Sequence, residues 1–174
     1  GTTNFSGNQG NKAGSATGTS YSFTALTATI GSLNAGANNV AASPLLGGSN
    51  GQAVFGFSLS SNGNQTVSAI NIQLSDDPAG IFSGFSLVQS TDTDFATTGD
   101  NITVGTSSIS VVGTEVQIIP SAAIDISAAK NLFLVANVDP AVTGTSGPIQ
   151  ASLGTANFSV NQGHKAGSAT GTNY

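Results

Sequence analysis

Three aspartates lie close together in "STDTDFATTGDN", residues 90–101, and carboxylates at this spacing could hold a cation. Asp92, Asp94 and Asp100 are separated by backbone carbonyl groups, and calcium takes oxygen ligands of both kinds. The stretch is not an EF-hand loop, because it lacks the central glycine and the final bidentate glutamate. The alternative is that these aspartates form turns by accepting hydrogen bonds from backbone amides. The sequence therefore predicts calcium at Asp92, Asp94 and Asp100 as the one possible cofactor, with turn formation as the alternative.

The chain lacks the residues from which common catalytic sites are built. It has no cysteine, and its single histidine is His164. Cys-His sites require a cysteine, and transition-metal centres draw their ligands mainly from cysteine and histidine. A glycosidase could use paired carboxylates, but Asp76 and Asp77 lie in the turn-like stretch "DDPAG", and there is no tryptophan for a sugar platform. We therefore expect a protein that is not an enzyme.

Composition excludes several partners. Only 6% of the 174 residues are charged, and three lysines face eight acidic residues, which gives a net charge of −5. Nucleic-acid binding and adsorption to an anionic membrane both require a basic surface. No stretch approaches the roughly 20 apolar residues of a membrane-spanning helix. The polar residues are mainly Ser, Thr, Asn and Gly, and this composition favours an extracellular, cell-surface location.

The first and last stretches of the sequence are nearly identical. "GTTNFSGNQGNKAGSATGTSY" at 1–21 recurs as "GTANFSVNQGHKAGSATGTNY" at 154–174, with 17 of 21 positions identical. His164 stands where the first copy has Asn11, so a catalytic role for the imidazole is not expected. Small polar residues dominate both copies, which is typical of a junction between modules rather than of a site. The aromatic residues assigned to this junction are Phe5, Phe158, Tyr21 and Tyr174.

Alternating apolar and polar residues predict short strands at a spacing of roughly 8–12 residues. In "QAVFGFSLSS" the residues Phe55, Phe57 and Leu59 share one face. The stretch "NLFLVANV" is apolar on both faces, which predicts a central strand covered on both sides. No long run has a helical period. The sequence therefore predicts an all-β, antiparallel β-sandwich, with a closed barrel as the alternative.

The repeat also predicts how the chain is divided. Residues 1–21 would be the end of a preceding repeat with its linker, and residues 22–160 a β-sandwich module. Residues 161–174 would be a junction leading into the next repeat, with a period of 153 residues. Near-identical ends indicate that similar units continue in both directions.

Three stretches resemble a known family. "FSLVQSTDTDFATTGDNITVG" resembles a strand–loop–strand unit of Ig-like, adhesion-related modules, in which Asp92 and Asp100 match acidic positions and Asp94 does not. "GQAVFGFSLSS" resembles their opening strand, and "NLFLVANVDPAVTGTSGPIQASL" their closing stretch. The resemblance covers about residues 45–160. Such modules occur in tandem in large secreted surface proteins of Bacteroidota. The resemblance implies an Ig-like β-sandwich, one module of a tandem array, without catalytic residues.

Three functions follow as hypotheses. The leading one is a structural repeat of a long extracellular bacterial filament or adhesin stalk, whose partners are adjacent copies and a surface or glycan target. The second is a calcium-dependent carbohydrate- or ligand-binding module built on loops 76–81 and 90–101. The third is a pilus-like subunit polymerised by strand exchange.

Overall fold

The protein is built from strands and loops. The computed structural model describes residues 18–22, 24–33, 45–96, 99–142 and 148–174, and these ranges contain no helix. They also contain no segment that could cross a membrane as an apolar helix. The strands are β1 (Thr27–Ser32), β2 (Gln52–Ser61), β3 (Thr66–Leu74), β4 (Phe82–Ser90), β5 (Ile102–Thr103), β6 (Thr106–Val112), β7 (Glu115–Pro120), β8 (Ile124–Asp125), β9 (Lys130–Val138), β10 (Gln150–Leu153), β11 (Phe158–Val160), β12 (His164–Gly167) and β13 (Ala169–Asn173).

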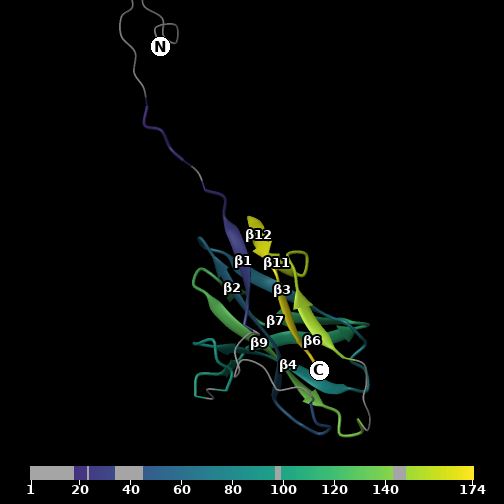
Figure 1. The fold of residues 1–174 in the computed structure, drawn as a ribbon. Coiled ribbons are helices and arrows are strands. Elements are labelled where there is room, and N and C mark those ends of the chain that lie inside the picture. Colours follow the sequence, from purple (N-terminus) through teal and green to yellow (C-terminus); the bar gives the residue numbers. More distant parts are fainter. Residues whose placement is uncertain (1–17, 23, 34–44, 97–98, 143–147) are drawn as a thin grey trace, which may run out of the picture.

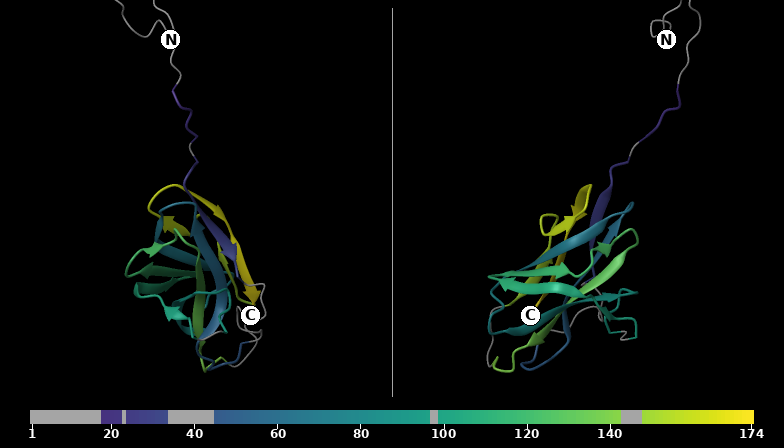
Figure 2. Two further views of the ribbon diagram at one scale, coloured as in Figure 1. Left: turned by 90° about the vertical axis from the view of Figure 1, so that its left-hand side faces the viewer. Right: turned by 180° about the vertical axis from the view of Figure 1, so that it is seen from behind.

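These strands form two sheets that face each other (Figures 1 and 2). The first sheet has the order β12-β1-β2-β9-β4-β5, and the second has the order β13-β10-β3-β7-β6, with β11 and β8 also paired to β3. Neighbouring strands are antiparallel except β1 and β12, which run parallel. The predicted all-β, antiparallel β-sandwich is therefore confirmed.

The core lies between the sheets and follows the alternation seen in the sequence. Phe55, Phe57 and Leu59 of β2 are fully buried, and the inward residues of β3 and β7 meet them from the other sheet. At about 25 cal/mol per Å² of apolar area, this burial is the main stabilising term of the fold. The strand β9 pairs with β2 on one side and β4 on the other. Both of its faces are buried, as predicted for a central strand.

The start of β1 and the C-terminus lie towards opposite ends of the sandwich (Figure 1). Thr27, the first residue of β1, lies opposite His164, the first residue of β12. Residues 18–22 lead to this end of the body, whereas the C-terminus lies towards the other end (Figures 1 and 2). The described chain thus enters at one end of the sandwich and finishes towards the opposite one.

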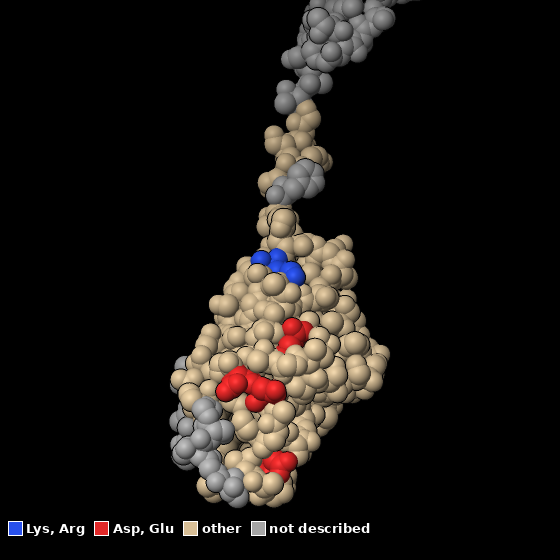
Figure 3. All heavy atoms as spheres, turned by 90° about the vertical axis from the view of Figure 1, so that its right-hand side faces the viewer, with Lys and Arg blue, Asp and Glu red and all other residues tan. Residues whose placement is uncertain are grey.

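The surface of the sandwich carries few charges. Figure 3 shows one face on which uncharged residues predominate and acidic side chains are scattered. This matches the charged fraction of only 6% in the sequence. Hydration of this surface therefore depends mainly on hydroxyl, amide and backbone groups.

Candidate functional site

The repeated segment at residues 154–174, which we call the C-terminal copy, forms part of both sheets. Its strand β11 pairs with β3, β12 pairs with β1, and β13 pairs with β10. The sandwich therefore extends beyond residue 160, the predicted end of the module. The small residues of this segment carry no clear alternation, so their strands are recognised only from the partners they pair with.

Phe158 anchors the C-terminal copy in the core. Its side chain is only 3% exposed and lies on β11 opposite Ile70 of β3. A tight turn leads into this strand, because Asn157 N donates to Gly154 O at 3.0 Å and Gly154 N donates to Asn157 Oδ1 at 3.1 Å. Lys165 covers the ring from outside, with Nζ 5.2 Å from the ring centroid. Phe158 is thus an integral core residue of the module.

The next residues of the C-terminal copy clamp the turn between β2 and β3. Thr66 N donates to Asn161 Oδ1 at 3.0 Å, and Asn161 N donates to Thr66 O at 3.1 Å. The buried Gln65 donates from Nε2 to the carbonyl oxygen of Gln162 and accepts at Oε1 from the Ser61 hydroxyl. These hydrogen bonds satisfy the amide group of Gln65, whose burial without partners would cost free energy.

Gly167 lets the C-terminal copy pass from one sheet to the other. Its φ is +84°, and a Cβ at this position would collide with the backbone carbonyl of Ile30. Only glycine tolerates both the positive φ and this close approach. Beyond it the chain joins the second sheet, where Ala169 is 2% exposed. Sequence reasoning missed this residue, although a glycine inside a strand-like stretch is the signal that marks such positions.

Tyr174 closes the C-terminal copy. Its backbone exchanges two hydrogen bonds with Ile149, at 2.9 and 3.1 Å, and its half-buried ring packs against the core. Burial raises the pKa of Tyr174 to about 12, and the nearby Thr172 hydroxyl opposes the shift. Within the described part of the chain, the buried Tyr174 hydroxyl has no hydrogen bond of good geometry. Tyr21, the matching residue of the first copy, is 77% exposed. Phe5 lies outside the described residues.

The positions at which the two copies differ lie on the surface of the C-terminal copy. Ala156, His164 and Asn173 are exposed, and Val160 is half-buried. Its two buried residues, Phe158 and Ala169, are identical in the other copy. Both residues that the sandwich buries are therefore the same in the two copies, although many exposed residues are identical as well. His164 is exposed at the start of β12.

The acidic loop, residues 90–101, uses its carboxylates to hold its own backbone. Asp100 Oδ2 accepts from the Thr91 hydroxyl at 2.7 Å, from the Ser90 hydroxyl at 3.0 Å and from the amide of Asp92 at 3.3 Å. The hydrogen bond from the Thr91 hydroxyl is the main cause that lowers the pKa of Asp100, while desolvation opposes it. Asp92 Oδ1 accepts from the amide of Asp94 at 2.7 Å. Hydrogen bonds from nearby backbone amides to Asp carboxylates are typical of turns.

The three aspartates do not form a ready metal cluster. Across the described ranges, no three His, Cys, Asp or Glu side chains are grouped so as to hold a metal ion. Two oxygens of the loop, Asp100 Oδ1 and Asn101 Oδ1, are nevertheless buried and have no hydrogen-bond partner among the residues that the structure describes. Calcium binding at Asp92, Asp94 and Asp100 therefore stays a prediction.

The acidic loop also covers the outer face of the first sheet. Phe95 packs on Phe133 of β9 with ring centroids 5.3 Å apart. The same small apolar cluster also contains Leu33, Ala53, Val88 and Val135. The hydrogen bonds of Asp92 and Asp100 thus have a structural consequence, since they hold the loop that carries Phe95.

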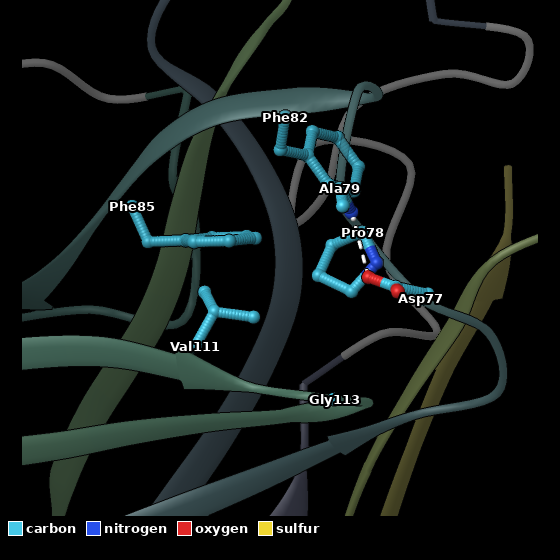
Figure 4. A pocket seen from close by; sticks show the side chains of 7 residues that line it. All are labelled: Asp77, Pro78, Ala79, Phe82, Phe85, Val111 and Gly113. Atoms are coloured by element: carbon cyan, nitrogen blue, oxygen red, sulfur yellow. Dashed lines mark hydrogen bonds between the residues drawn. The ribbon is translucent and has the colours of Figure 1, made fainter.

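An open pocket of about 370 Å³ lies between β4, the turn before it and the β6–β7 hairpin (Figure 4). Phe82 and Phe85 meet edge to face there, with centroids 5.4 Å apart. Asp77 is the one ionisable residue of the lining, and its Oδ1 accepts from the amide of Ala79 at 2.9 Å. Asp76 Oδ1 likewise accepts from the amide of Asp77. Loop 76–81 therefore contributes to a pocket, whereas the acidic loop is not part of its lining.

Comparison with known proteins finds distant similarity to solved structures. No protein-family model matches the chain, and no curated protein matches it. A DUF4466 family protein from Parabacteroides merdae is similar in structure, with a TM-score of 0.41 and 16% sequence identity. The similarity covers 86% of this chain and 44% of that one, so the chain spans less than half of its neighbour's length.

Proposed function

We propose that the chain is a non-catalytic structural repeat of a long extracellular bacterial filament or adhesin stalk. One observation carries the proposal: the segment that completes both sheets at 154–174 recurs at 1–21, five residues before β1. Residues 1–21 would then complete the preceding sandwich as β11–β13 complete this one. The Ig-like, adhesion-related resemblance of residues 45–160 supports the same role.

The course of the chain supports a head-to-tail arrangement. The chain enters beside the start of β12 and ends towards the opposite end of the body (Figure 1). Only residues 22–26 would separate Tyr21 of one module from Thr27 of the next, so the two residues would lie at most about 22 Å apart. Such a short connection brings neighbouring modules into contact, so adjacent copies are the proposed partners.

The uncharged surface supports close stacking and an extracellular location. With 6% charged residues, neighbouring modules would meet without strong like-charge repulsion. Serine, threonine, asparagine and glycine keep such a surface hydrated. No basic face is available for nucleic acid, since the sequence contains only three lysines and no arginine.

A chain of two periods tests the assignment of the repeat to the preceding module. We would extend residues 1–174 by a second copy of residues 22–174 and measure amide hydrogen exchange in both modules. Replacing the Phe158 equivalent of the central copy by Asp should destroy protection in the first module and leave the second protected. Loss of protection in the second module alone would assign the segment to the module that follows it and contradict the proposal.

A calcium-dependent ligand-binding module is the second candidate function. The buried, unpartnered Asp100 Oδ1 and Asn101 Oδ1 favour it, because calcium takes carboxylate and amide oxygens. Calorimetric titration with calcium, followed by common glycans, tests this candidate. Binding should disappear in Asp100→Asn and persist in Asp139→Asn, whose carboxylate holds a separate turn. If the unaltered chain does not bind calcium in this titration, this candidate function is wrong.

A further inference from the structure

The C-terminal copy is held by surfaces that the rest of the module provides. Strands β1, β3 and β10 supply the backbone partners, and the β2–β3 turn supplies Gln65 and Thr66. The cavity for the Phe158 ring lies among core residues of β3 and its neighbours. These surfaces accept any segment with the same backbone requirements and the same buried side chains.

Residues 1–21, the N-terminal copy, have those features. Its residues at the anchoring positions match those of the C-terminal copy: Phe5 for Phe158, Lys12 for Lys165, Gly14 for Gly167, Ala16 for Ala169 and Tyr21 for Tyr174. The substitutions between the copies fall on three exposed positions and on the half-buried Val160, which is Gly7 in the N-terminal copy. Tyr21 is 77% exposed, so this residue of the N-terminal copy is not packed as Tyr174 is.

We propose that the N-terminal copy of one molecule can take the place of the C-terminal copy in a second molecule. The partner is therefore a second copy of this chain, joined by strand exchange along β1, β3 and β10. The C-terminal copy normally prevails, because its tether to β10 gives it a high effective concentration. Gly7 favours the same outcome, since glycine weakens a strand relative to valine. We expect strand exchange between molecules when the packing of the C-terminal copy in its own module is weakened.

This inference does not depend on the tandem arrangement. It requires only that the two segments are interchangeable, whether or not the modules belong to one long polypeptide. If exchange fails while the two-period chain behaves as expected, the tandem proposal stands alone. If strand exchange occurs but the two-period chain does not behave as expected, the function of the repeated segment is exchange between separate chains.

Three full-length variants test the exchange by light scattering coupled to size-exclusion chromatography. Phe158→Asp should form concentration-dependent dimers and longer species, because its own β11 cannot be buried and an intact Phe5 is available from a neighbour. The double variant Phe5→Asp/Phe158→Asp has the same damaged module without a donor and should not form them. Phe5→Asp alone should remain monomeric. Equal association of the single Phe158→Asp variant and the double variant would overturn the proposal.

A peptide experiment covers the case in which Phe158→Asp does not fold alone. A synthetic peptide of residues 1–21 should bind the Phe5→Asp/Phe158→Asp chain and restore its circular dichroism. The Phe5→Asp peptide should bind more than about 100-fold more weakly, and the Gly7→Val peptide about fivefold more tightly. Failure of the unaltered peptide to bind this chain or the milder Phe5→Asp/Phe158→Ala chain would also overturn the proposal.

Discussion

Lys165 Nζ lies 5.2 Å from the centroid of the Phe158 ring and donates to the backbone carbonyl oxygen of Phe158 at 2.9 Å. The two residues belong to different sheets, since β11 pairs with β3 and β12 pairs with β1. One side chain therefore joins both layers of the sandwich through a cation–π contact and a charge-assisted hydrogen bond. Phe5 and Lys12 repeat the same pair, at the same separation in sequence.

Removing the lysine charge should destabilise the module measurably. We expect Lys165→Gln to lower the free energy of unfolding by about 1–2 kcal/mol, because it weakens both contacts with Phe158. Lys130→Gln is the matched control, since the Coulombic interaction of Lys130 with Asp125 is the smallest of the causes that lower the pKa of Asp125, and we expect a change in stability of less than about 0.5 kcal/mol. Urea unfolding measures both. Equal losses in the two variants would show that the contact with Phe158 contributes nothing specific.

Gly167→Ala should be far more damaging than alanine at another glycine of positive φ. At Gly167 a methyl group would strain the backbone and collide with the carbonyl of Ile30, so we expect a loss of more than about 3 kcal/mol. Gly113 also has a positive φ, but nothing lies within 4 Å of its Cβ position. Gly113→Ala should therefore cost only about 1–2 kcal/mol. Thermal unfolding of the two variants compares them, and similar losses would contradict the role of Gly167 in the sheet change.

Tyr174 should titrate far above the ordinary value for tyrosine. Tyr21→Phe leaves Tyr174 as the only tyrosine, and the chain has no tryptophan, so near-ultraviolet phenolate absorbance reports on this residue alone. We expect a midpoint at about pH 12 in the folded chain and about 10 in urea. The folded pKa is the higher one, so the contribution to stability is complete below about pH 10 and is lost towards about 12. A folded midpoint near 10 would mean that the hydroxyl is not buried.

The parts of the fold that were predictable are those in which large side chains alternate. β2 and β3 carry apolar residues at every second position, and β9 carries them on both faces. Their burial outweighs other local preferences, so the pattern alone defines the strands and the central place of β9.

The C-terminal copy was not predictable in the same way. β12 and β13 consist mainly of Gly, Ala and Thr, and only one of their side chains, Ala169, is buried. Their positions depend on backbone pairing with distant strands and on the positive φ of Gly167, neither of which is visible in composition. The aspartates of the acidic loop were ambiguous for another reason. The same carboxylates suit calcium and turns, and the positions of Ser90 and Thr91 around Asp100 emerge only in three dimensions.

Asp100→Asn should loosen the acidic loop and uncover Phe133. The folded pKa of Asp100 lies below the ordinary value of 3.8, so its contribution to stability is present above that ordinary value and is lost as the pH falls through the folded pKa. In the variant we expect faster hydrogen exchange at the amide of Asp92, which donates to Asp100 Oδ2. The cover that Phe95 provides should weaken with it, because the loop holds that ring over β9.

Asp139→Asn is the matched control for this prediction. Asp139 also accepts a hydrogen bond from a backbone amide in a turn, that of Ala141 at 2.8 Å, but Asp139 is not part of the acidic loop. Exchange in the acidic loop should therefore be unchanged in this variant, and stability at low pH should keep the dependence that Asp100 confers. Unaltered loop exchange in Asp100→Asn would show that the carboxylate does not hold the loop, and that Phe95 stays on Phe133 through apolar packing alone.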